Sequence, residues 1–248
     1  MALNPIECLE TLTLCTNHAP ETVRNICQRR GLTYIDFFII DSRTKVYVFN
    51  REGMYVIAVT NPQNDLDIEL SPQSKPMLGV DNTYVKYKKE RARVQTELHD
   101  KYWFVVSRVY KCVEEILNGY NFYPTTFQFI GHGIGGAIAT LLCMEMSRKF
   151  TSVLPVLMTF GSPRIGDDNL KKLFNCLVKE CKRFVVKRDP MPKRPSLIHN
   201  FRHVIKETCF DKSGKQCKIN TGSKKIRHPL QSYLNCVTRH YDSKQYVR

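Results

Sequence analysis

The sequence lacks the features that mark membrane-spanning, exported or modular proteins. No apolar run reaches the roughly 18 residues that a bilayer-spanning helix needs. The first ten residues carry Glu7 and Glu10 and no basic start, so they do not resemble a secretory signal peptide. No internal repeat or linker divides the 248 residues, which are enough for one well-packed core. We therefore expect a single domain over 1–248, without a transmembrane segment, located inside the cell or peripherally at a membrane.

The ten cysteines form no dense, short-spaced framework of the kind found in small secreted domains. Reduced thiols in the core are the expected state. Cys209 and Cys217 flank a short turn and could pair in an oxidising compartment. Together with His199 and His203 they could also form the four ligands of a zinc site, but their spacing matches no standard zinc pattern. We expect neither a metal nor another cofactor.

Positive charge is in clear excess, with 38 Lys and Arg against 23 Asp and Glu and a formal net charge of +15. Such a balance favours anionic partners, which include phospholipid surfaces, acidic proteins and nucleic acid, but charge alone does not choose among them. The densest basic run covers 86–93 and is expected to be a solvated helix face, with binding to an anionic surface as the alternative. Tyr84 before this run and Tyr87 within it are a slight indication of nucleic-acid binding, the least favoured partner.

Hydrophobic periodicity predicts strands that alternate with helices. This alternation predicts an α/β fold with a mostly parallel central sheet that is covered by helices on both faces. A loop or flap is expected over 61–83, where prolines recur without periodicity. Strands are expected at 33–40, 45–49, 55–60, 127–130, 155–160, 183–187 and 201–206, and helices within the first thirty residues, at 94–117, 134–150 and 167–179, and from Pro229 onward.

A glycine-rich turn joins the strand at 127–130 to the helix that follows. The segment 129–137 reads Phe-Ile-Gly-His-Gly-Ile-Gly-Gly-Ala. A strand that enters a helix through such a turn is the setting of a nucleophile elbow, in which one side chain stands on a sharp bend between small residues. The exposed position would be 133, which is glycine here, so no oxygen or sulfur is available to attack a carbonyl.

The same turn permits two other interpretations. Gly131, Gly133 and Gly136 match the Gly-x-Gly-x-x-Gly pattern of dinucleotide-binding proteins. That pattern needs an acidic residue about 20 positions on, at the end of the next strand, and the strand ending at Phe160 supplies none. The glycines could also simply allow the helix to pack closely on the strand, which is compatible with an elbow.

Several motifs in a fixed order make the chain resemble the class 3 lipases, the family of fungal triacylglycerol lipases. The family elbow reads Gly-His-Ser-Leu-Gly-Gly-Ala, and 131–137 matches it except at the serine and leucine. The family motif Thr-Phe-Gly-x-Pro-Arg-Val-Gly appears at 159–166 with only isoleucine for valine. An Asp-Pro-x-Pro segment follows at 189–192, and a histidine precedes a Tyr-containing helix at 228–233. The resemblance spans about 45–240 and leaves an N-terminal helical extension over about 1–31.

The resemblance implies an α/β-hydrolase fold and assigns roles to individual residues. Asp189 corresponds to the acid of a catalytic triad and His228 to its base, while Gly133 stands where the nucleophilic serine should be. His203 is a rival for the base, although it matches a non-catalytic histidine of the family. The remaining elbow residues are Gly131, His132, Gly135 and Gly136.

The family's oxyanion region corresponds to Ile134, directly after the nucleophile position, and to Pro62. Proline offers neither a backbone N–H nor a hydroxyl, so a second part of the catalytic machinery is expected to be lost. We therefore expect a catalytically inactive lipase-like protein that binds lipid, a membrane surface or a protein. The alternatives are an active esterase with a displaced nucleophile at Ser162 or Ser196, and a basic nucleic-acid-associated or regulatory module.

Overall fold

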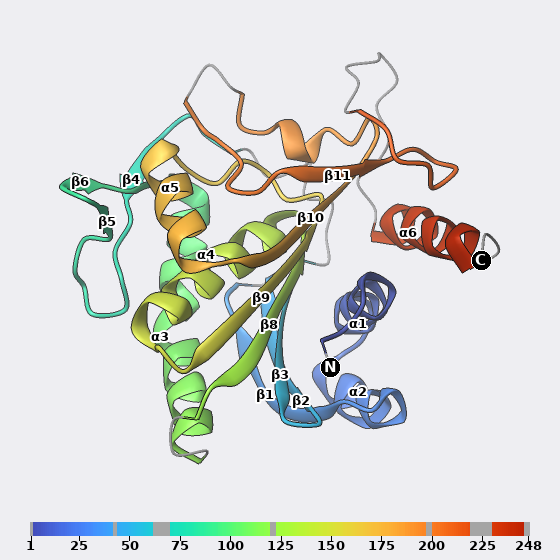
Figure 1. The fold of residues 1–248 in the computed structure, drawn as a ribbon. Helices are drawn as coiled ribbons and strands as arrows, with labels where there is room; N and C mark the ends of the chain where they lie inside the picture. The colour runs from blue at the N-terminus through green and yellow to red at the C-terminus, as the bar shows by residue number, and fades with distance from the viewer. Residues whose placement is uncertain are drawn as a thin grey trace.

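The computed structural model describes residues 2–41, 44–61, 70–119, 123–196, 200–218 and 230–245. Its centre is a seven-stranded sheet in the order β1-β2-β3-β8-β9-β10-β11 (Figure 1). The β1–β2 and β2–β3 pairs are antiparallel, whereas every pairing from β3 to β11 is parallel. The predicted α/β-hydrolase-like fold with a mostly parallel sheet is confirmed. The strands are β1 (Thr33–Ile39), β2 (Lys45–Arg51), β3 (Met54–Thr60), β8 (Thr125–His132), β9 (Val153–Phe160), β10 (Glu180–Val186) and β11 (Glu207–Phe210).

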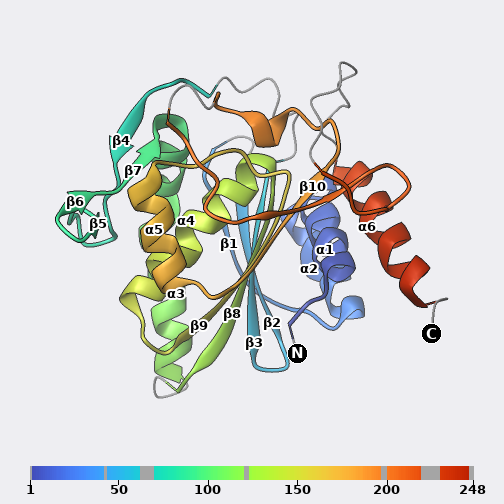
Figure 2. The same cartoon turned by 45° about the horizontal axis from the view of Figure 1, so that its top comes forward.

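Helices cover both faces of this sheet. Figures 1 and 2 show α3, α4 and α5 on one face and α1, α2 and α6 on the other. None of the helices in the described ranges is long and apolar enough to cross a membrane. The helices are α1 (Pro5–Asn17), α2 (Pro20–Cys27), α3 (Thr96–Gly119), α4 (Gly133–Lys149), α5 (Asp168–Leu177) and α6 (Leu230–Gln245).

The two helical layers enclose two hydrophobic cores, and the central strands contribute to both. Along β2, Val46 and Val48 face the core under α3 and α4, while Tyr47 and Phe49 face the core under α1 and α6. This alternation follows from the two-residue period of side chains along a strand. Because both faces are covered, β3 is buried along its whole length.

The basic run at 86–93 forms a β-hairpin, so the expected helix face was wrong. Lys88 occupies the turn in the left-handed region, with φ 55°, and the guanidinium of Arg91 lies 3.7 Å from the centre of the Tyr84 ring. A run of exposed charges is equally well solvated on a helix or a hairpin, so its composition does not distinguish the two. Two small sheets result, from β4 (Ser74–Pro76) with β7 (Arg93–Gln95) and from β5 (Lys86–Tyr87) with β6 (Glu90–Arg91).

Three other boundaries differ from expectation. The last strand was predicted at 201–206, but the structure has it at β11. Residues 201–206 form only an isolated bridge between Arg202 and Gly166, although Phe201 and Val204 are buried as strand residues would be. The predicted loop at 61–83 contains the short strand β4, and 62–69 lies outside the described residues. The N-terminal helical region is divided into α1, α2 and a 3₁₀ turn, and the predicted helix start at Pro229 lies outside the described residues.

Candidate functional site

The chain turns from strand to helix at a single residue, Gly133. His132 is still extended, with φ −116° and ψ 141°, and α4 begins at the next residue. Gly133 has φ 54°, in the left-handed region that strains most L-residues. This is the backbone geometry of an elbow, and it lies at the carboxyl end of β8 in the middle of the sheet.

The glycines around the bend are required by close contacts. A Cβ on Gly131 would lie 2.4 Å from the carbonyl oxygen of Gly135, and a Cβ on Gly135 would lie 2.4 Å from that of Val59. A Cβ on Gly136 would lie 3.1 Å from the Cβ of Ser162. The helix therefore approaches β3 and β8 more closely than any residue with a side chain would allow.

Asp189 follows β10 at the same edge of the sheet and is 3% exposed. Its carboxylate accepts a hydrogen bond of 2.9 Å from the backbone N–H of Met191 and another from the hydroxyl of Tyr233, on α6. Burial, together with the neighbouring carboxylate, raises the pKa of Tyr233 well above its usual range. Tyr233 consequently stays a neutral donor and holds the carboxylate in place.

Tyr233 also connects the Asp189 loop to the elbow. Its ring packs edge-on against His132, with ring centres 5.3 Å apart, and against Phe160, at 6.3 Å. His132 immediately precedes the bend at Gly133. One side chain thus joins the carboxyl ends of β8, β9 and β10, which is where ligands bind in open α/β sheets.

Two of the residues predicted for the site, His228 and Pro62, lie outside the described residues. Ile134 is buried in the first turn of α4, directly after the bend. The elbow and Asp189 are therefore the parts of the expected site that the structure brings together.

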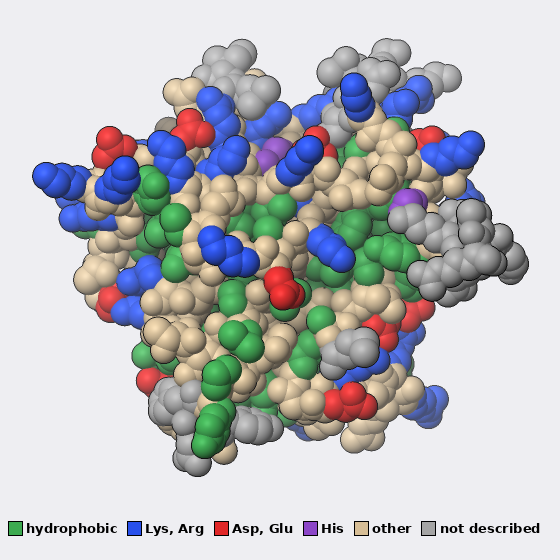
Figure 3. Space-filling view, in the orientation of Figure 1, with side chains coloured by type: hydrophobic (Ala, Val, Ile, Leu, Met, Phe, Trp, Pro, Cys, Tyr) green, Lys and Arg blue, Asp and Glu red, His purple; other side chains and the backbone are tan. Residues whose placement is uncertain are grey.

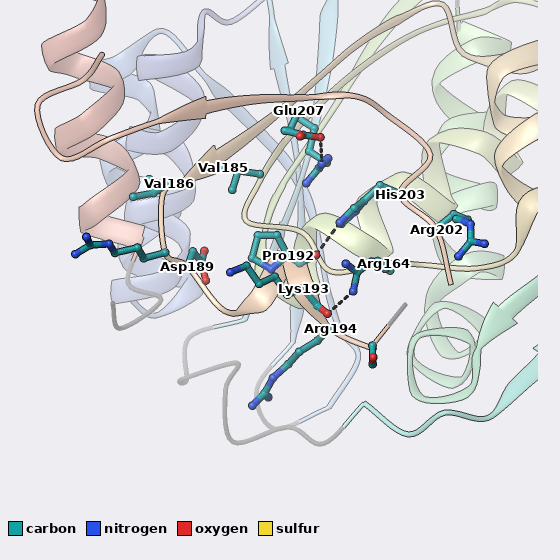
Figure 4. A pocket seen from close by; sticks show the side chains of 13 residues that line it. Arg164, Val185, Val186, Asp189, Pro192, Lys193, Arg194, Arg202, His203 and Glu207 are labelled. Atoms are coloured by element: carbon teal, nitrogen blue, oxygen red, sulfur yellow. Dashed lines mark hydrogen bonds and ion pairs between the residues drawn. The ribbon is translucent and has the colours of Figure 1, made fainter. Parts of the chain in front are cut away.

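His203, the rival base, is held as a neutral donor. Its Nε2 lies 2.7 Å from the carbonyl oxygen of Pro192, which can only accept (Figure 4). Burial, and next the positive charge of Arg183, lower the pKa of His203 to about 3. Of the alternative nucleophiles, Ser162 is buried and its Oγ lies 3.4 Å from the carbonyl oxygen of Pro163, whereas Ser196 lines a pocket rich in arginine.

Buried polar atoms near the elbow were not anticipated from the sequence. The hydroxyl of Thr60, both amide atoms of Asn61 and the hydroxyl of Thr159 have no hydrogen-bond partner among the residues that the structure describes. All three residues stand at or directly after the carboxyl ends of β3 and β9, beside the elbow strand. Their position at strand ends was the available signal, because side chains at that edge face the ligand-binding crevice in such folds.

The postulated zinc site is not assembled from the described part of the chain, where no three His, Cys, Asp or Glu side chains are grouped to hold a metal. His199 lies outside that part. The sulfur atoms of Cys209 and Cys217 are 3.4 Å apart as free thiols.

Comparisons with known proteins agree with this geometry. The family model "Lipase (class 3)" matches residues 59–199. Secreted mono- and diacylglycerol lipase 1 of Fusarium solani is 32% identical over 35% of this chain and 26% of its own length. Phospholipase A(1) DAD1, a chloroplastic protein of Arabidopsis thaliana, is 28% identical over 35% of this chain and 20% of its own. The chain thus matches only about a quarter of the length of these curated relatives.

Solved structures show the same fold. Lipase II from Rhizopus niveus superimposes with a TM-score of 0.62 at 20% identity, covering 80% of this chain and 77% of the other. The triacylglyceride lipase of Rhizomucor miehei does so with a TM-score of 0.61 at 18% identity, covering 84% and 78%. From the family match, the shared fold and the elbow with its neighbouring carboxylate, we conclude that the chain belongs to the class 3 lipase family.

Proposed function

We propose that this protein is a non-hydrolytic member of its family that binds lipid at a membrane surface. The observation that carries the proposal is the glycine at the elbow, because Gly133 has no atom that can form an acyl-enzyme. Asp189 and His228 would then be the remaining acid and base of a triad without its nucleophile. A modest acceleration over water can survive the loss of a nucleophile, but turnover through a covalent intermediate cannot.

The missing oxyanion donor points the same way. Pro62 has no N–H to offer, which leaves the backbone N–H of Ile134 as the family's other donor. Removing one such donor typically slows acyl transfer by about 10²–10³-fold. Two independent losses in one site favour binding without hydrolysis over a single inactivating exchange.

Lipid is the ligand class that the relatives support. The curated relatives are named as mono- and diacylglycerol lipases and as a phospholipase A(1). The net charge of +15 adds a preference for anionic surfaces. Figure 3 shows Lys and Arg side chains gathered along the upper edge of that view, over β4–β6 and around β11. Two of the relatives are named as secreted, so the intracellular location stays a prediction.

The first test measures binding and hydrolysis in parallel. We expect the protein to sediment with vesicles that contain phosphatidylserine and to remain soluble with phosphatidylcholine alone. We expect no hydrolysis of p-nitrophenyl butyrate above the level of a denatured sample. Ester hydrolysis that is lost in His228→Ala would contradict the proposal, and so would labelling of Ser162 or Ser196 by a fluorophosphonate probe, which would indicate a displaced nucleophile.

The second test restores the hydroxyl. Gly133→Ser supplies a hydroxyl nucleophile at the bend. Gly133→Ala is its matched control, because both variants place a Cβ at φ 54° and only the serine variant adds an oxygen. The shared backbone strain should cost about 1–2 kcal/mol of stability in each. Activity in Gly133→Ser that disappears with His228→Ala would indicate that the base is still in reach. Equal inactivity of both variants would indicate decay beyond the serine.

A further inference from the structure

A pocket of about 640 Å³ lies beside Asp189, on the side occupied by the 192–196 segment and by 202–207 (Figure 4). It is not part of the elbow, since neither Gly133 nor Ile134 lines it. Its described walls carry two acidic residues, Asp189 and Glu207. They also carry six cationic residues, Arg164, Arg183, Arg188, Lys193, Arg194 and Arg202.

The acidic residues are already engaged by other groups. Glu207 accepts a hydrogen bond of 2.6 Å from Nη2 of Arg183, and Asp189 accepts from Tyr233 and from the Met191 backbone. Glu207 is therefore paired with one guanidinium, and Asp189 accepts from two neutral donors. Six cationic residues against two carboxylates give the described walls a positive balance, and such a cavity concentrates anions.

Arg183 is a buried cation with an unused donor. It is 3% exposed, its Nε donates to the carbonyl oxygen of Ile205 at 3.1 Å, and its Nη1 has no hydrogen-bond partner within the described part of the chain. Burial, the largest effect, lowers the pKa of Arg183 even though Glu207 raises it. An unsatisfied buried N–H is unfavourable, and a small movement toward an oxygen acceptor would relieve it.

Arg164 and Arg202 are less buried than Arg183. Arg164 uses Nη1 to bind the carbonyl oxygens of Lys193 and Pro195, which fixes its guanidinium in the wall (Figure 4). Burial and then the charge of Arg202 lower the pKa of Arg164. The nearest acid to Arg202 is Asp168, whose Oδ1 lies 3.6 Å from Nε and whose side chain is 60% exposed, so solvent screens that pair.

Besides the charged residues, the wall carries uncharged side chains. His203 is neutral, with its Nε2–H donated to Pro192, so it adds no charge. Val185 and Pro192 supply apolar surface. The pocket thus combines guanidinium groups, whose paired N–H donors match phosphate oxygens, with an apolar side that can contact a short organic group.

We propose that this pocket binds a phosphate monoester, with the phosphate between Arg164 and Arg202 above Arg183, and the organic part against Val185 and Pro192. A dianion matches the charge surplus better than a single carboxylate. The phosphate could belong to a lipid headgroup or to a soluble organic phosphate, and both have the same chemistry. The inference goes beyond the proposed lipid binding and does not require it.

The experiment uses the full chain and two probes. Binding of glycerol 3-phosphate to the protein is measured by calorimetric titration at constant ionic strength. Binding to vesicles that contain phosphatidic acid is compared with binding to vesicles that contain the same fraction of phosphatidylserine instead. Arg202→Gln removes one fork, and Lys88→Gln removes one charge from the β5–β6 turn, away from the pocket. We expect Arg202→Gln to weaken glycerol 3-phosphate binding about ten-fold, which is about 1.4 kcal/mol. Lys88→Gln should change it by less than about two-fold, since exposed charges are screened.

The outcomes separate the sources and the two proposals. Saturable glycerol 3-phosphate binding without a preference for phosphatidic acid identifies a soluble ligand, and a preference that is lost in Arg202→Gln identifies a headgroup. Either result supports phosphate binding in the pocket, even if the protein does not bind phosphatidylserine vesicles and the proposed lipid binding is wrong. Absence of saturable binding to both phosphate probes overturns the inference. Equal losses in Arg202→Gln and Lys88→Gln also overturn it, because they indicate general surface charge.

Discussion

Replacing Gly135 by alanine tests how tightly α4 is seated at the elbow. Alanine in place of a helical glycine normally stabilises a protein by about 1 kcal/mol. Here the new Cβ would lie 2.4 Å from the carbonyl oxygen of Val59, whereas ordinary contacts begin near 3.4 Å. The helix or β3 would have to retreat by about 1 Å, in a region where α4 also packs on α3, β8 and β9. Overpacking of this kind costs about 3 kcal/mol at the upper end of its usual range.

The net expectation for Gly135→Ala is a loss of about 2 kcal/mol, because the steric cost exceeds the gain in helix propensity. For a chain of this length the melting temperature should fall by about 4–8 °C. Calorimetry or thermal circular dichroism measures this directly. The matched control is Gly119→Ala in the last position of α3, where a Cβ meets nothing within 4 Å and stability should be unchanged or slightly higher. A Gly135→Ala protein as stable as its parent would refute the close seating.

Three further predictions concern individual side chains. Glu145 is fully buried and accepts two hydrogen bonds from Arg148, so Glu145→Ala should lose about 3 kcal/mol in urea unfolding, and Glu145→Gln should lose less. Among the described thiols, exposed Cys176 should react with Ellman's reagent in the native protein while buried thiols such as Cys143 do not, and Cys176→Ser should remove the fast phase. His203 stays neutral when folded, with a pKa of about 3, but takes a proton near pH 6.5 when unfolded. Its contribution to stability is therefore fully present above about pH 6.5 and is lost as the pH falls from there to about 3, at no more than about 1.4 kcal/mol per pH unit. A His203→Gln variant with the same slope would contradict this.

Local steric demands made the elbow predictable. The order of glycines at 131–136 and the motif at 159–166 belong to short segments whose backbone permits few residue types, so they identified the fold and the family. The alternation of apolar residues likewise located the central strands, because a strand covered on both faces has a clear signature.

Features that depend on distant residues were not predictable. Tyr233 and Asp189 are 44 positions apart, and no spacing rule indicates that the hydroxyl of one holds the carboxylate of the other. The arginine pocket combines residues from the loop after β9, from β10 and from the segment before β11. Tertiary contacts decided both of these. In the 86–93 run, charge without apolar periodicity did not distinguish a hairpin from the helix face that we expected.

The packing of α1 against α6 has a consequence for biosynthesis. Figure 1 shows these helices side by side, although more than two hundred residues separate them along the chain. The layer that covers one face of the sheet is therefore incomplete until α6 has been synthesised, although α1 also packs on β3 and β8. The carboxylate loop at 189 should consequently acquire its tyrosine contact as one of the final folding events.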